Sequence, residues 1–240
     1  MADDASFRPA LIVVDFQEDF CPPSGHGAHQ DGRRPRQNGS LAVPDGRSIA
    51  PQINELLTCP FAVKIATRDW HPPNHISFAP NHPPASTTVT VRHPTEPHRE
   101  YSTALWPVHC VQSTPGAELV PELDAALLHD VVDKGTDPRF EMYSAFYDPF
   151  TISDTGLTDR LKAERITDVF VVGLAADFCV RATAEHARDE GFRSHIIEQA
   201  TRPVVPDKWP ECRRDILAKG VLIVSAQGPE VSRVRSLAVA

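Results

Sequence analysis

The chain has 240 residues, 41% hydrophobic and 23% charged, a composition that excludes a disordered protein and fits one large domain or two small ones. Its formal charge is −8 and no basic run exceeds two arginines, so we expect a small-molecule partner, with no nucleic acid and no membrane. No apolar run approaches the roughly 18 residues of a membrane span, and the first residues lack a secretory signal pattern, which predicts a cytoplasmic protein. Five cysteines without a CxxC pair argue against a disulfide scaffold and predict at least one free thiol.

Short apolar, β-branched runs alternate along the chain with segments of helical spacing. Strands are expected at Ala10–Val14, Phe61–Ala66, Val131–Val132, Val169–Val172, His195–Ile197 and Val221–Val224. Helices are expected at Ile49–Leu57, Thr155–Glu164, Val180–Glu190 and Pro206–Lys219. This alternation predicts an α/β fold with a doubly wound, mostly parallel sheet and helices on both faces.

Two long connections interrupt the first half of the chain. The segment Cys21–Asp45 is rich in glycine, proline and arginine and has few residues to bury, so it predicts a flexible insertion at 22–40. The segment Trp70–Trp106 carries aromatic residues that can anchor it, and we expect it to be ordered and functional. No internal repeat or linker divides the chain, which predicts a single domain over 1–240.

Polar residues follow four of the predicted strands: Asp15; Asp69 and His71; Asp133 and Lys134; Asp177 and Cys179. In an open α/β sheet, ligands bind beyond the carboxyl ends of the strands. Taken singly, an Asp after a strand is commonly a helix N-cap, and a Cys that begins a helix is commonly a small buried side chain. Four such positions on one rim nevertheless favour a functional site.

Cys179 is the candidate nucleophile of this rim. A thiol at a helix N-terminus is expected to have a lowered pKa, with backbone N–H groups nearby that can bind an oxyanion. No histidine has an obvious place beside it, since His186 lies about two turns along the same helix. Asp15, its pKa raised by partial burial, can take the thiol proton and return it, while Lys134 holds both groups electrostatically. These residues predict a Cys–Asp–Lys triad.

A metal site is a second hypothesis for the same region. Asp69 and His71 place two ligand types on one side of an extended segment. More histidines follow at His75, His82, His93, His98 and His109. A lone Asp-x-His pair in a loop more often makes surface hydrogen bonds, so spacing alone leaves both interpretations open.

Five segments together resemble one family: ALIVVDFQEDF, TRDWHPPNHISFA, LWPVHCVQSTPGAEL, VVDKG and VVGLAADFCVRATA. In order and approximate spacing the chain resembles the nicotinamidase branch of the isochorismatase-like cysteine hydrolases over roughly residues 9 to 225. The first and last segments mark the whole superfamily. The tryptophan- and histidine-containing segments point to the nicotinamidase branch, and their combination is specific.

The resemblance implies an isochorismatase-like fold and a role for each matching residue. The catalytic residues would be Asp15, Lys134 and Cys179, with an oxyanion hole from the N–H groups of Ala175 and Cys179 after a cis Leu174–Ala175 peptide. A divalent metal, expected to be Zn2+, would bind Asp69, His71 and His109. Glu141 would contact metal-bound water, and His75 would lie next to the metal ligands or bridge through a water without binding the metal directly. The substrate ring would lie between Phe20, Trp106, Tyr143 and Phe178.

The same resemblance implies hydrolysis of nicotinamide to nicotinate and ammonia through a cysteine thioester, as in NAD salvage, with pyrazinamide as a further substrate. It leaves a homo-oligomer open. Two alternatives stand beside it: an amidase of the same superfamily acting on a ureido or carbamoyl group, and a non-catalytic binding domain. Relatives of the first kind generally lack the metal ligands, and the three occupied triad positions argue against the second.

Overall fold

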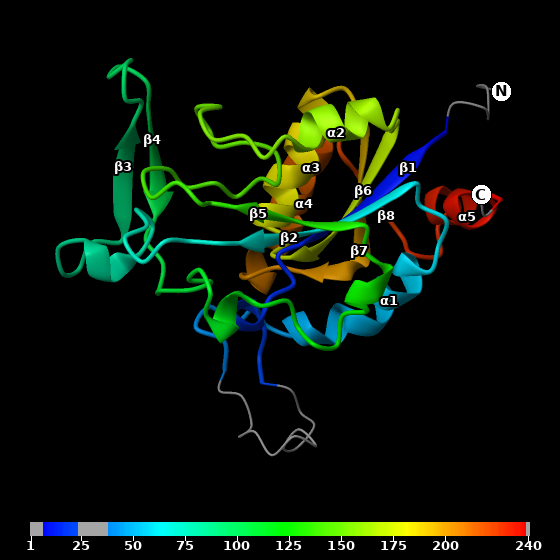
Figure 1. The fold of residues 1–240 in the computed structure, drawn as a ribbon, viewed down its shortest axis with the longest axis horizontal. Helices are drawn as coiled ribbons and strands as arrows, with labels where there is room; N and C mark the ends of the chain where they lie inside the picture. The colour runs from blue at the N-terminus through cyan, green and yellow to red at the C-terminus, as the bar shows by residue number, and fades with distance from the viewer. Residues whose placement is uncertain (1–6, 24–37, 239–240) are drawn as a thin grey trace.

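The computed structural model describes residues 7–23 and 38–238 (Figure 1). Its centre is a six-stranded parallel sheet with the order β5-β2-β1-β6-β7-β8. The strands are β1 (Pro9–Val14), β2 (Val63–Asp69), β5 (Asp130–Lys134), β6 (Asp168–Leu174), β7 (Arg193–Arg202) and β8 (Leu222–Val224). All six correspond to predicted apolar runs, and the predicted α/β fold with a parallel sheet is confirmed.

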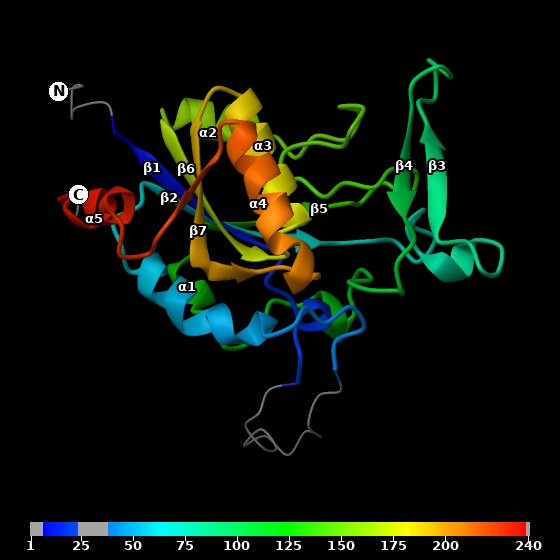
Figure 2. The same ribbon diagram turned by 180° about the vertical axis from the view of Figure 1, so that it is seen from behind.

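Helices cover both faces of this sheet, as predicted (Figures 1 and 2). One face packs against α1 (Ala50–Leu57) and α5 (Pro229–Arg235), and the other against α2 (Leu157–Ala163), α3 (Cys179–Asp189) and α4 (Trp209–Ala218). Strand β1 is apolar throughout because it is buried on both faces of the sheet. Leu11 and Val13 enter the first core, and Ile12 and Val14 enter the second, because successive side chains of a strand point to opposite faces.

Several helices begin where the chain carries a proline. Pro51, Pro210 and Pro229 lie in the first turns of α1, α4 and α5. Proline suits this position because the first N–H groups of a helix have no intrahelical acceptor and its φ is already helical. Short 3-10 turns complete the described helical structure, at Glu18–Phe20, Gly46–Ile49, Ala79–Asn81, Pro115–Ala117, Ala125–Leu127 and Pro206–Lys208.

A second, two-stranded sheet projects from the body (Figure 1). Its antiparallel strands β3 (Thr88–Arg92) and β4 (Glu100–Ala104) lie within the proline-rich segment 70–106. Val91 packs with Phe140 and Phe150 in a small third core. The segment is therefore ordered, as expected, but the hairpin itself was not predicted, because each strand buries only one residue and its apolar signal is weak.

Most of the expected insertion, residues 24–37, lies outside the described residues. Its two ends are neighbours, since Gly39 donates its N–H to the carbonyl oxygen of Cys21 at 3.1 Å. Flexibility of 22–40 and the single domain stay predictions. All five cysteines are buried free thiols, which confirms the prediction of at least one. In the part of the chain that is described, no helix has the length and apolar character needed to cross a membrane.

Candidate active site and metal site

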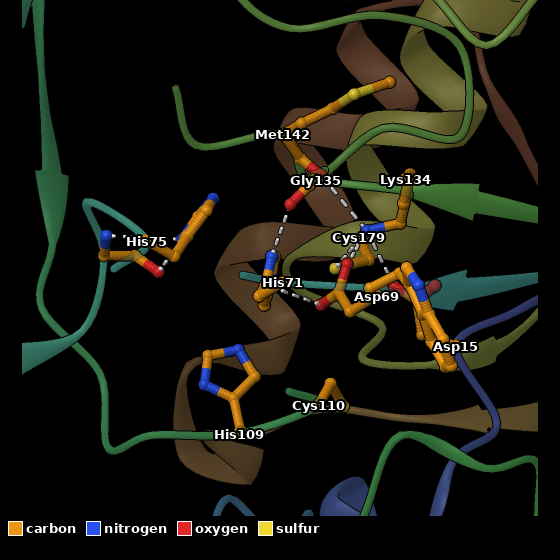
Figure 3. A network of polar contacts seen from close by, with 12 residues as sticks. Asp15, Asp69, His71, His75, His109, Cys110, Lys134, Gly135, Met142 and Cys179 are labelled. Atoms are coloured by element: carbon orange, nitrogen blue, oxygen red, sulfur yellow. Dashed lines mark hydrogen bonds and ion pairs between the residues drawn. The ribbon is translucent and has the colours of Figure 1, made fainter. Parts of the chain in front are cut away.

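The predicted triad residues meet at the carboxyl rim of the sheet (Figure 3). Asp15 follows β1, Lys134 ends β5, and Cys179 is the first residue of α3, after β6. The Lys134 Nζ atom lies 3.0 Å from Asp15 Oδ2 and 3.6 Å from Cys179 Sγ. All three side chains are buried, so the lysine is the cation shared by an acid and a thiol shielded from water.

The charges of this cluster follow from burial and from their mutual attraction. Burial raises the pKa of Asp15 to about 6, against the opposing effect of the Lys134 ammonium. Thr67 donates its hydroxyl to Asp15 Oδ1 at 2.6 Å. Burial alone would lower the pKa of Lys134, but the Asp15 and Asp69 carboxylates outweigh it and raise that pKa well above its ordinary value. At neutral pH the pair is therefore a carboxylate and an ammonium.

The pKa predicted for Cys179 is wrong in direction. Burial raises the pKa of this thiol well above its ordinary value, and the lowering effect of Lys134 does not compensate, with the nearby Asp15 carboxylate adding to the rise. The helix N-terminus was expected to determine the pKa of Cys179. A fully buried thiolate loses its hydration, and this loss is the larger effect on the pKa. In the free protein Cys179 is therefore a thiol, and it needs a base at the moment it attacks.

Backbone donors lie next to the thiol. The Leu174–Ala175 peptide is cis, as expected. Among the described residues, the N–H groups of Ala175 and Cys179 have no hydrogen-bond acceptor, and both residues line the same cavity. Two unpaired N–H groups beside a nucleophile can bind the negative oxygen that develops when a carbonyl is attacked.

Asp69, His71 and His109 form a second cluster, and their ligand atoms lie within 4.8 Å of one another. The Nδ1 atom of His71 lies 2.8 Å from the carbonyl oxygen of Gly135, and that of His109 lies 2.7 Å from the carbonyl oxygen of Pro107. A carbonyl only accepts, so each Nδ1 carries a proton, and each Nε2 is the ring atom that can bind a metal in its deprotonated form. The buried Nε2 of His71 has no hydrogen-bond partner. Two such imidazoles and a carboxylate suit a divalent metal such as zinc.

His75 has no free ring nitrogen. Its Nδ1 lies 2.8 Å from the hydroxyl of Ser77, its Nε2 lies 3.1 Å from the carbonyl oxygen of Phe140, and its ring stacks on His71 at 4.0 Å. Burial and the neighbouring His71 lower the pKa of His75 to about 3, which keeps it neutral. This arrangement agrees with the expectation that His75 supports the cluster without binding a metal directly.

Asp69 joins the two clusters. One carboxylate oxygen accepts a hydrogen bond from Lys134 Nζ at 2.5 Å, and the other lies 3.5 Å from His71 Nε2. The side-chain amide of Gln17 holds the Asp69 main chain, accepting from its N–H and donating to its carbonyl, both at 2.8 Å. Burial would raise the pKa of Asp69, but Lys134 and His71 hold it well below the ordinary range.

A cavity lies over both clusters, and its lining includes Asp69, His109, Glu141, Ala175 and Cys179. Burial raises the pKa of Glu141. The four residues expected to hold a ring all line this cavity: Phe20, Trp106, Tyr143 and Phe178. The Phe178 ring lies 5.1 Å from that of Trp106 and 5.6 Å from that of Tyr143. Polar groups of both clusters and four aromatic rings thus line one cavity.

Three aliphatic residues of this cavity were missed: Leu41, Val43 and Val204. Leu41 and Val43 follow the expected insertion, and their alternation was the only signal they offered. Val204 lies on the loop after β7, where the Asp177 carboxylate accepts its N–H at 2.9 Å. Asp177, one of the polar residues at the strand ends, therefore positions a wall residue.

The remaining polar candidates lie outside the two clusters. Asp133 pairs with Arg68 at 2.8 Å on the opposite side of β5. His186 stacks on Tyr147 at 4.3 Å, away from Cys179. His82, His93 and His98 belong to the projecting segment, where His82 faces the carbonyl oxygen of Ile76 and His93 and His98 lie near Glu96.

Comparison with known proteins agrees with this geometry. Residues 9–217 match the isochorismatase domain model. The chain is 38% identical over 219 residues to a nicotinamidase of Acinetobacter baylyi, covering 91% of this chain and 92% of that protein. The chain belongs to the nicotinamidase branch of the isochorismatase family.

Solved structures of this family agree in fold. The yeast nicotinamidase Pnc1p bound to the inhibitor nicotinaldehyde has a TM-score of 0.80 at 32% identity, covering 90% of this chain and 99% of that one. The pyrazinamidase of Pyrococcus horikoshii in complex with zinc has a TM-score of 0.67 at 33% identity, covering 91% and 99%. The isochorismatase-like fold expected from the sequence motifs is thus confirmed.

Proposed function

We propose that the protein hydrolyses nicotinamide to nicotinate and ammonia through a thioester on Cys179. One observation carries this proposal: Asp69 joins a Cys–Asp–Lys cluster to an Asp–His–His metal set within a single aromatic-walled cavity. A flat aromatic amide has a carbonyl for the first cluster and a ring nitrogen for the second. A cavity that brings both sets of polar groups together with aromatic rings matches such a substrate.

The metal set fits zinc by its donor types. Asp69, His71 and His109 would hold the ion, with water or substrate completing the shell, while His75 and Glu141 support them. When bound, the ion supplies a Lewis-acid position that takes the pyridine nitrogen and so orients the ring. Its role is to orient the substrate, because the reacting thiol and its base are supplied by the other cluster.

The chemistry begins with Asp15, whose carboxylate accepts the Cys179 proton as Sγ attacks the carboxamide carbon. The N–H groups of Ala175 and Cys179 stabilise the oxyanion, and the Lys134 ammonium offsets the negative charge near Asp15. Collapse of the tetrahedral intermediate breaks the C–N bond. Asp15 gives its proton to the leaving nitrogen, and ammonia departs from the thioester.

The second half of the reaction reverses the proton path. A water molecule attacks the thioester carbon while Asp15 accepts its proton. Cleavage of the C–S bond releases nicotinate, and the proton on Asp15 returns to Cys179. Phe20, Trp106, Tyr143 and Phe178 hold the ring through both halves by apolar contact. The cavity also suits pyrazinamide, which keeps the amide and a ring nitrogen.

The alternatives differ in what they require of this cavity. An amidase acting on a ureido or carbamoyl group needs no metal site to bind a substrate ring nitrogen. Three buried residues that can hold a metal nevertheless lie beside the thiol here. A non-catalytic domain has no need to bury a lysine between an acid and a thiol, at the expense of hydration. The homo-oligomer stays a prediction.

The decisive experiment measures ammonia release from nicotinamide by the wild type and by Cys179→Ala, with zinc content measured on both. We expect a loss of at least about 10⁴-fold in kcat with zinc retained. Cys59→Ala, which removes another buried thiol, serves as the control and keeps activity. Turnover surviving in Cys179→Ala would refute the nucleophile assignment. Activity of the wild type on N-carbamoyl substrates, with none on nicotinamide, would favour the alternative amidase.

A further inference from the structure

Strand β4 of the projecting hairpin touches the functional site from outside the main sheet. Its residues alternate, so that Tyr101 and Thr103 face the body of the protein while Ser102 is exposed. The two inward side chains reach Glu141 and Tyr143, which are also two residues apart. The hairpin therefore forms hydrogen bonds with the short segment 141–143 at two residues.

The first contact is made by the Tyr101 hydroxyl. It accepts the backbone N–H of Glu141 at 3.0 Å and donates to the carbonyl oxygen of the same residue at 3.5 Å. The Tyr101 ring packs against Phe150 at 5.0 Å, which fixes its direction. Tyr101 thus holds the main chain of Glu141, whose carboxyl group accepts the N–H of Met142 at 3.0 Å and lines the cavity.

The second contact is a chain of three side chains. Trp106 Nε1 lies 3.0 Å from the Tyr143 hydroxyl, and Thr103 Oγ1 lies 3.1 Å from it on another side. An indole nitrogen only donates, so the phenol oxygen accepts from Trp106 and its own proton is available to Thr103. With its hydroxyl engaged in this way, Tyr143 offers the cavity an aromatic surface without a spare donor.

The segment 141–143 serves both clusters. Glu141 lines the cavity, the carbonyl oxygen of Met142 accepts a hydrogen bond from Lys134 Nζ at 3.1 Å, and Tyr143 forms part of the aromatic wall. Its placement is therefore critical for the lysine and for the ring. The only side chains of β4 that reach this segment through hydrogen bonds, among the described residues, are Tyr101 and Thr103.

We propose that Tyr101 and Thr103 are positioning residues of the active site, and that the hairpin serves to hold segment 141–143. Thr103 sets the orientation of the Tyr143 and Trp106 rings and so acts on substrate binding. Tyr101 sets the main chain at Glu141 and Met142 and so acts on the lysine of the triad. This inference rests on the proposed nicotinamidase function.

The test separates KM from kcat in two hydroxyl-deleting variants. Thr103→Val is expected to raise KM for nicotinamide about fivefold, as for loss of one hydrogen bond. It should raise Kd for nicotinate, measured by tryptophan fluorescence, by the same factor. Its kcat stays within about twofold of the wild type. Tyr101→Phe is expected to lower kcat about fivefold by the same reasoning, with a smaller change in KM. Thr103→Ser, which keeps the hydroxyl, restores KM, and the exposed Ser102→Ala leaves both parameters unchanged.

A double-mutant cycle protects the test against general destabilisation. Thr103→Val and Tyr143→Phe remove the two ends of one hydrogen bond, and Tyr143→Phe also loses the bond from Trp106, so the double variant should be little worse in KM than Tyr143→Phe alone. Fully additive effects, or a KM for Thr103→Val equal to that of Ser102→Ala, would overturn the proposal. Failure of the proposed function looks different, because the wild type itself would then release no ammonia from nicotinamide.

Discussion

The carboxyl rim of the sheet and the segment 70–111 build two halves of one cavity by different means. At the rim, Asp15 and Lys134 come directly from strand ends and bind each other as charges. In the segment, His71 and His109 come from loops, and main-chain carbonyl groups orient their rings. The sheet register fixes the first half, since Asp69 lies opposite Lys134 in the β2–β5 ladder. Local loop geometry fixes the second half.

This difference suggests a division of labour. In the proposed mechanism the rim carries the groups that make and break bonds, and its charges are buried, so changes there should affect turnover and stability together. In the same proposal the segment 70–111 carries the two histidines of the metal set and one ring of the aromatic wall, so changes there should affect binding and leave the fold in place. Three predictions, in order of decreasing effect, test this division.

Removal of the buried cation should give the largest effect. Lys134→Met leaves the Asp15 and Asp69 carboxylates facing each other without a counter-charge. We expect turnover to fall at least about 10³-fold and the free energy of unfolding to fall by about 3–5 kcal/mol, measured by denaturant titration. Lys162→Met, which breaks an exposed ion pair with Glu190, should cost less than about 1 kcal/mol. Equal losses of unfolding free energy in the two variants would show that the buried charges of the rim matter no more for stability than a surface ion pair.

A smaller effect is expected where the two halves meet, at Gly135. Its φ of 63° is left-handed, and a Cβ there would lie 2.5 Å from the His71 ring. Gly135→Ala should displace His71 and weaken zinc binding about 10–100-fold, measured by competition with a chelator. Gly156→Ala is the matched control, because Gly156 also has a positive φ of 76° but open space around it. Zinc affinity lowered equally in both would show that backbone strain, and not the His71 contact, is responsible.

The smallest effect concerns the pH dependence of the rim. Asp15 must be deprotonated to act as a base, and its pKa is raised by burial to about 6. Below this pH, kcat/KM should therefore fall about tenfold per pH unit. Thr67→Val removes the hydroxyl that donates to the carboxylate, which destabilises the charged form and should move this acid limb upward by about half a pH unit.

Thr183→Val is the control for that shift. It deletes another buried hydroxyl, one that accepts the N–H of Ala145 and does not touch Asp15. Its acid limb should match that of the wild type. An acid limb in Thr67→Val that stays in place or moves downward would contradict the assignment of Asp15 as the titrating base.

The sequence alone predicts the six strands of the main sheet, because each contains a short apolar run; β1 and β6 are buried on both faces, whereas the edge strands β5 and β8 are partly exposed. It also places Asp15, Lys134 and Cys179 on one rim through the rule that ligands bind beyond strand ends. The metal set needed the family motifs, since Asp69 and His109 are 40 residues apart and spacing alone left other interpretations open. The catalytic and binding roles of these residues stay predictions.

Features that depend on contacts between distant segments were not visible in the sequence. The hairpin strands bury one residue each, too few for a recognisable pattern. Val204 joins the cavity only because Asp177 holds its loop. The pKa of Cys179 was predicted in the wrong direction because local sequence reports the helix N-terminus but not how completely other elements cover the thiol.

Hydrophobic patterning and motif chemistry are local properties, and they determined the sheet, the order of its elements and the types of reacting group. The tertiary structure decided which groups form the buried ion pairs, which histidine nitrogens lack a hydrogen-bond partner, and which residues line the cavity. Asp69 illustrates both levels. Its place at the end of an apolar strand is written in the sequence. Its contact with Lys134 exists only once β2 and β5 pack together, because burial and short-range electrostatics act through space and not along the chain.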